Sequence, residues 1–62
     1  MCLSTVYKNE MTPDTVVMRN VMRIECKDGC VILTDLMDRQ VAIEGQLTEA
    51  NLVDGFVVVK EN

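Results

Sequence analysis

The sequence predicts an all-β domain, in which a small antiparallel sheet curls into a barrel. Val and Ile are abundant, and the apolar residues recur with a spacing of two, which is the period of a half-buried strand. Turn signals such as Asp28-Gly29 and Asp54-Gly55 separate the apolar segments. The 62 residues contain no linker, repeat or low-complexity segment, so we expect residues 1–62 to form one small domain.

Two strands and a tight turn are predicted in the first half. Residues 2–8 alternate as a first strand, and residues 9–14, which include Pro13, form a loop. Residues 16–26 form a long strand. One of its faces is expected to carry Met18, Met22, Ile24 and Cys26, and the other Arg19, Arg23 and Glu25. Asp28-Gly29 then closes a hairpin, because a two-residue turn needs residues that tolerate positive φ.

The second half is predicted to return twice across the sheet. Residues 31–34 form a strand, residues 35–38 a turn, and residues 39–44 a strand with Val41 and Ile43 inward. Gly45 breaks or bends the chain, and residues 47–52 fit either a strand or a short helical turn capped by Thr48. Residues 56–60 end the fold. The total of five to seven short strands is typical of an SH3-like or Sm-like barrel or a curled sheet.

The last predicted strand suggests a second copy of the chain. Residues 56–59 are apolar on both faces, and such a strand is normally buried on both sides. In so small a domain the second covering surface would come from another copy. We therefore expect a homodimer.

Composition argues against two classes of partner. The net charge is −4, no run of Lys or Arg occurs, and only one Phe and one Tyr are present, so nucleic-acid binding is not expected. The longest apolar run, residues 56–59, is far shorter than a membrane-spanning helix, and no signal peptide is visible. A cytoplasmic location and no membrane association are the default expectations.

The residue types also argue against an enzyme. The chain has no histidine, which removes an imidazole base, the usual catalytic triads and any imidazole metal ligand. Its three glycines are isolated, so no phosphate-binding loop is present. A barrel of this size leaves no interior pocket for a substrate. We therefore predict a binding protein.

Three cysteines are present: Cys2, Cys26 and Cys30. An odd number favours free thiols in a reducing compartment over a disulfide framework. If Asp28-Gly29 is a two-residue turn, Cys26 and Cys30 lie on opposite faces of the hairpin and can share neither a disulfide nor a metal. If the loop is longer, the two thiols could face each other.

Cys2 is the candidate metal ligand. If Met1 is removed, the Cys2 amine and sulfur close a five-membered chelate; if Met1 stays, its amine, the Cys2 amide nitrogen and the Cys2 sulfur can bind in sequence. Two chains related by a twofold axis would pool two sulfurs and two or more nitrogens, a set that suits Ni(II) or Cu(II). The competing interpretation is that Cys2 is a small half-buried side chain at the start of a strand.

The opening Met1-Cys2-Leu3-Ser4-Thr5-Val6-Tyr7 resembles the start of the CooT family of small nickel-binding proteins. The resemblance continues through the strand and turn positions up to the terminal valines. It implies an SH3-like or Sm-like homodimer that binds one Ni(II) per dimer through the cysteine matching Cys2. It also implies a role in nickel insertion into carbon monoxide dehydrogenase, with that enzyme or its maturation proteins as partners. Cys26 and Cys30 are outside the family's motif.

Two hypotheses about function follow. The first is a dimeric Ni(II) carrier for carbon monoxide dehydrogenase maturation, with Cys2 thiolates and N-terminal nitrogens as ligands. The second is a metal-independent Sm-like module that binds a protein partner or RNA. The acidic charge and the lack of stacking aromatic residues oppose the RNA version of the second.

Overall fold

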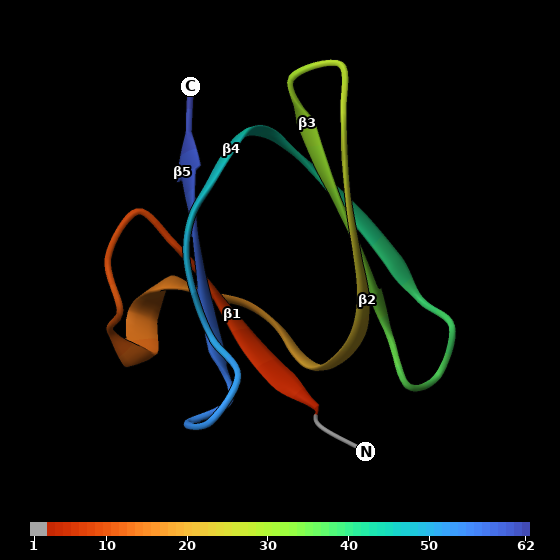
Figure 1. Cartoon of the computed structure of the whole chain (residues 1–62), viewed down its shortest axis with the longest axis vertical. Helices are drawn as coiled ribbons and strands as arrows, with labels where there is room; N and C mark the ends of the chain where they lie inside the picture. Colours follow the sequence, from red (N-terminus) through yellow and green to blue (C-terminus); the bar gives the residue numbers. More distant parts are fainter. Residues whose placement is uncertain (1–2) are drawn as a thin grey trace.

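The computed structural model describes residues 3–62 as one barrel of five strands (Figure 1). The strands are β1 (Ser4–Lys8), β2 (Val16–Lys27), β3 (Cys30–Asp35), β4 (Gln40–Asn51) and β5 (Phe56–Glu61), and a 3-10 turn, η1, covers Pro13–Thr15. The predicted all-β barrel is confirmed. Within residues 3–62 no helix has the length and apolar character needed to cross a membrane.

The barrel closes through a parallel pair of strands. Each strand is antiparallel to the next along the chain, and β1 then pairs with β5 in parallel, with Thr5 opposite Phe56 and Lys8 opposite Val59. The cause is geometric: when five consecutive strands alternate in direction, the first and the fifth point the same way. The predicted antiparallel arrangement therefore holds for every pair except the closing one.

Short aliphatic side chains fill the barrel. They come from alternating positions of all five strands, as the period of two predicts. The buried cluster consists of Val6, Val21, Val31, Leu33, Ile43, Val57 and Val59. No aromatic residue belongs to it, which agrees with a sequence that has one Phe and one Tyr.

Strand β5 is covered on both faces within a single chain. Val57 and Val59 are fully buried and Val58 is 9% exposed. Thr48 on β4 donates a hydrogen bond to the Val58 carbonyl oxygen at 3.1 Å. The two-faced apolar strand was the reason for expecting a second copy, and the structure removes that reason, because the chain covers this strand itself.

The inward face of β2 differs from the expected one. Val21 is 3% exposed, whereas Met22, which was expected to face inward, is 48% exposed. Asn20 has a φ of 57°, and the pairing with β3 is irregular between Val21 and Arg23. A bulge of this kind shifts the alternation of side chains. On either side of it Met18 and Ile24 pack against the core, whereas Cys26, predicted on the same face, is exposed.

Both predicted hairpin turns are present. Lys27 pairs with Cys30 across a two-residue turn in which Asp28 and Gly29 have φ values of 51° and 79°. Two successive positive φ angles are the signature of the turn that best matches strand twist. The second turn occupies residues 52–55, between the paired residues Asn51 and Phe56, and Gly55 has a φ of 76°.

Gly45 bends β4 without breaking it. On one side of it Glu44 pairs with Cys30 of β3, and Gly45 itself pairs with Glu61 of β5, so the strand changes partner here. Residues 47–51 continue as strand, which excludes the helical alternative for this segment. A Cβ atom at Gly45 would overlap the carbonyl oxygen of Lys60 and lie 2.9 Å from its carbonyl carbon. Only glycine fits this corner.

We predict that Gly45→Ala lowers the free energy of unfolding by about 3 kcal/mol, because main-chain atoms must move to admit the methyl group. Urea denaturation monitored by circular dichroism measures the loss. Gly29→Asn is the control: nothing lies within 4 Å of a Cβ there, and asparagine tolerates positive φ. Equal stability of the Gly45→Ala and wild-type chains would contradict the close packing at this corner.

Candidate functional site

The start of β1 is fixed at one end of the barrel. The Thr5 amide donates a hydrogen bond to the Gly55 carbonyl oxygen at 2.9 Å, and Ser4 is buried opposite Val21. The described chain therefore begins, at Leu3, at the same end as the β3–β4 and β4–β5 turns, which is the lower end of Figure 1. The predicted metal ligand Cys2 precedes Leu3 and, like Met1, lies outside the described residues.

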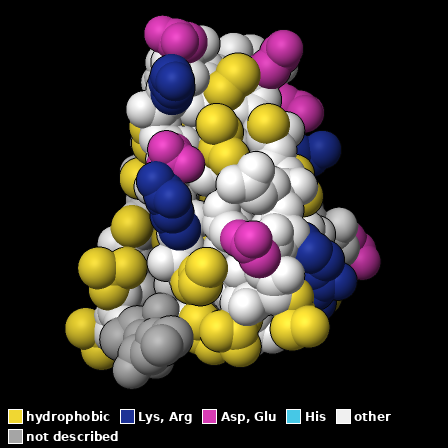
Figure 2. Space-filling model, turned by 90° about the vertical axis from the view of Figure 1, so that its right-hand side faces the viewer, with side chains coloured by type: hydrophobic (Ala, Val, Ile, Leu, Met, Phe, Trp, Pro, Cys, Tyr) yellow, Lys and Arg dark blue, Asp and Glu magenta, His cyan; other side chains and the backbone are white. Residues whose placement is uncertain are grey.

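This end of the barrel carries exposed apolar side chains on both turns. Leu36 and Met37, after β3, are 51% and 74% exposed, and Leu52 and Val53, after β4, are 66% and 96% exposed. We call these four residues the apolar rim. Figure 2, in which the vertical axis is the same as in Figure 1, shows hydrophobic side chains gathered at the lower end of the molecule. Groups of exposed apolar side chains mark interaction surfaces.

The other two cysteines lie at the opposite end, on the β2–β3 hairpin at the top of Figure 1. Cys26 is exposed and pairs with Val31, while Cys30 is half-buried and pairs with Lys27. These neighbouring positions of the ladder point to opposite faces, as the two-residue turn predicted. Within residues 3–62 no group of three or more Cys, Asp or Glu side chains is arranged to hold a metal ion.

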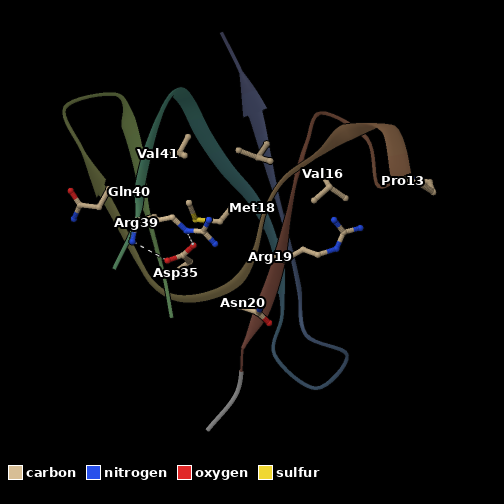
Figure 3. A pocket seen from close by; sticks show the side chains of 10 residues that line it. Pro13, Val16, Met18, Arg19, Asn20, Asp35, Arg39, Gln40 and Val41 are labelled. Atoms are coloured by element: carbon tan, nitrogen blue, oxygen red, sulfur yellow. Dashed lines mark hydrogen bonds and ion pairs between the residues drawn. The ribbon is translucent and has the colours of Figure 1, made fainter. Parts of the chain in front are cut away.

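A hollow of about 630 Å³ opens on the side of the barrel (Figure 3). We call it the side groove. Its lining comes from the start of β2, the end of β3, the start of β4 and the 3-10 turn: Pro13, Val16, Val17, Met18, Arg19, Asn20, Asp35, Arg39, Gln40 and Val41. It lies between strand edges and is open to solvent. The sequence pattern does not predict this groove, because its place depends on where the pairing of β2 with β3 ends.

Asp35 and Arg39 form the one strongly organised ion pair of the groove lining. Asp35 is 2% exposed; its Oδ1 accepts hydrogen bonds from the Met37 and Arg39 amides at 2.9 Å, and its Oδ2 accepts one from Arg39 Nε at 2.7 Å. The bond from the Arg39 amide is the largest of the effects that lower the pKa of Asp35 below its usual value. Burial opposes it, and the Arg39 side chain and the Met37 amide lower the pKa further. Asp35 is therefore ionised at neutral pH.

The sequence pattern predicts that Asp35 lies in a turn and indicates no other role for it. The available signal was an aspartate at the start of a turn with an arginine four residues later. Aspartate in that position commonly accepts hydrogen bonds from main-chain amides that follow it. Its burial was not predictable, because it depends on Val21, the residue opposite Asp35, which the bulge in β2 turns inward.

Comparison with known proteins gives one family match. A family model described as CO dehydrogenase accessory protein CooT matches residues 1–60, which is almost the whole chain and includes Met1 and Cys2. A search of curated proteins gives no match.

The ion pair generates a prediction about pH. Because folding lowers the pKa of Asp35, its contribution to stability is present above its unfolded pKa, near 3.8, and is lost as the pH falls from there through the folded value. Asp35→Asn is expected to unfold at lower temperature than the wild type at pH 7, with the difference shrinking toward pH 2. Asp38→Asn, an exposed position in the same turn, is the matched control. A constant difference between pH 7 and pH 2, measured by thermal denaturation, would contradict this account.

Proposed function

Because this chain belongs to the CooT family of CO dehydrogenase accessory proteins, we propose that it carries Ni(II) for the maturation of CO dehydrogenase. One ion is held between two copies of the chain by Cys2. The observation that carries the proposal is the family match, which extends to Met1 and Cys2. Membership of the family implies that the protein is an accessory protein of CO dehydrogenase. Our proposal adds that it carries nickel and that Cys2 is a nickel ligand.

The donor set at the chain start suits nickel. Each chain offers a thiolate sulfur and, beside it, an amine or amide nitrogen, but at most three donors in sequence. Two chains supply two sulfurs and at least two nitrogens, and mixed nitrogen and sulfur ligands in a plane favour Ni(II) or Cu(II) over zinc. Since the thiol must lose its proton to bind, nickel affinity is expected to rise with pH.

The position of β1 supports a shared site. Leu3, the first described residue, lies at the same end of the barrel as the apolar rim. Two copies that meet through their rims would therefore bring their chain starts together. Full burial of a Leu, Met or Val side chain stabilises by about 1.5–3 kcal/mol. Because these side chains are already partly buried in each copy, the four from each copy gain less than eight full burials, and this gain must exceed the roughly 4–15 kcal/mol that association costs. A dimer held this way is of moderate affinity, and a bridging ion would strengthen it.

A site between two chain starts also suits delivery. A carrier must release its ion, and a planar site with few protein ligands leaves the metal open to attack by ligands of the recipient. The chain has no histidine to complete a closed cage. Transfer to the recipient is then an exchange of ligands on the ion.

We predict that Cys2→Ser lowers Ni(II) affinity at least about a hundredfold, because it removes both sulfur ligands of the shared site. Titration followed by the thiolate-to-nickel absorption band measures affinity, and native mass spectrometry is expected to give one nickel per two chains. The control is the double variant Cys26→Ser and Cys30→Ser, which should retain both the band and the stoichiometry. An unchanged band in Cys2→Ser would refute the proposal.

A separate prediction concerns the dimer. Val53→Glu places a charge on the apolar rim at a position that is 96% exposed, so the fold should tolerate it. The dimer dissociation constant is expected to rise at least about tenfold, which corresponds to roughly 1.4 kcal/mol. Sedimentation of the metal-free chain measures this, with Gln46→Glu, exposed near the opposite end of the barrel, as the control. If both variants dimerise like the wild type, the rim is not the interface.

A further inference from the structure

Arg39 is held in place while most of its side chain remains in solvent. Its Nε donates to Asp35 Oδ2 at 2.7 Å, and its own amide donates to Asp35 Oδ1 at 2.9 Å, so one buried carboxylate fixes both ends of the residue. The Arg39 side chain is still 74% exposed. Figure 3 shows the guanidinium group beside Met18 at the groove. Its two terminal amino groups remain available for a second, two-pronged bond to a carboxylate.

A strand edge without a partner runs along the same groove. Strand β2 pairs with β3 only from Val21 onward, and the Asn20 carbonyl oxygen accepts one further bond on that side, from the Leu36 amide at 2.9 Å. For residues 16–19 the described chain shows pairing with β1 alone. All four of these residues line the side groove. An accessible edge of this kind can accept an extended segment as an additional strand.

The charges of the groove determine which kind of extended segment it can bind. Its lining contains Arg19, Arg39 and Asp35, and all hydrogen bonds to Asp35 noted above come from Met37 and Arg39. In Figure 3 the Arg19 side chain turns away from Arg39, so Arg19 adds positive potential and Arg39 makes the direct contact. The chain as a whole has a net charge of −4, so this groove attracts acidic groups where much of the remaining surface repels them.

We propose that the side groove docks an extended acidic segment of a partner protein, which adds to the free edge of β2 and places a carboxylate on Arg39. Main-chain hydrogen bonds to residues 16–19 supply the strand pairing, and Arg39 supplies the selection for Glu or Asp. Val41 and Met18, both partly buried, give apolar contact to the alternating side chains of such a segment. This docking site uses neither Cys2 nor the apolar rim. The docking proposal can therefore be tested independently of nickel binding.

The test is a titration of the metal-free chain followed by 15N–1H NMR. The probes are the peptide acetyl-Thr-Val-Glu-Val-Thr-amide, the same peptide with Gln in place of Glu, and glutarate. We expect the Glu peptide to shift the amide signals of residues 16–19 together with the Arg39 Nε–H signal. The Gln peptide should bind at least about fivefold more weakly, because it lacks the charge-assisted bond.

Variants complete the design. Arg39→Gln should weaken binding of the Glu peptide at least about fivefold. Lys27→Gln makes the same change of charge on the distant β2–β3 hairpin and should leave binding of this peptide unchanged. If Arg39→Gln fails to fold, Arg39→Lys takes its place, because it keeps the charge and loses the two-pronged geometry. The proposal is overturned if no probe shifts residues 16–19. It is equally overturned if glutarate shifts the Arg39 signal as much as the Glu peptide does while the signals of residues 16–19 stay unshifted, since the groove would then bind small free acids.

Discussion

The parallel contact between β1 and β5 is the constraint on which the rest of the molecule depends. It turns an open antiparallel sheet into a ring and places Val6 against Val57 in the core. It also anchors the beginning of β1, through the bond from the Thr5 amide to Gly55, beside the β4–β5 turn. Without this contact neither the core nor the end of the barrel at which Leu3 lies would have a defined geometry.

Much of the fold follows from the sequence because local rules decide it. The structure has a turn at each Asp-Gly pair, and Asp28, Gly29 and Gly55 take the positive φ angles that such turns need. Alternation correctly assigns Val41 and Ile43 to the inward side of their strand. Where alternation fails, as at Val21 and Met22, a non-glycine residue, Asn20, takes up a positive φ and the strand gains a bulge. Nothing local in the sequence distinguishes that asparagine from others.

Less of the candidate site than of the fold could be predicted from the sequence. The family match supports the resemblance seen in the opening residues, and the pairing of Lys27 with Cys30 confirms that Cys26 and Cys30 lie on opposite faces of the hairpin. The Asp35–Arg39 pair and the side groove were not predictable, because they depend on where long strands change partners. Gly45 marks one such point, and the end of the β2–β3 ladder at Val21 marks another. These are relations between distant segments, which a pattern along the chain does not contain.

The parallel pairing of β1 with β5 also has a consequence during synthesis of the protein. The partner of β1 lies at residues 56–59, near the other end of the sequence, so the ring cannot shut until those residues have left the ribosome. Until then β1 has only β2 beside it, and a two-stranded hairpin is at best marginally stable in water. A polypeptide released early would lack both the finished barrel and the β4–β5 turn that carries half of the apolar rim.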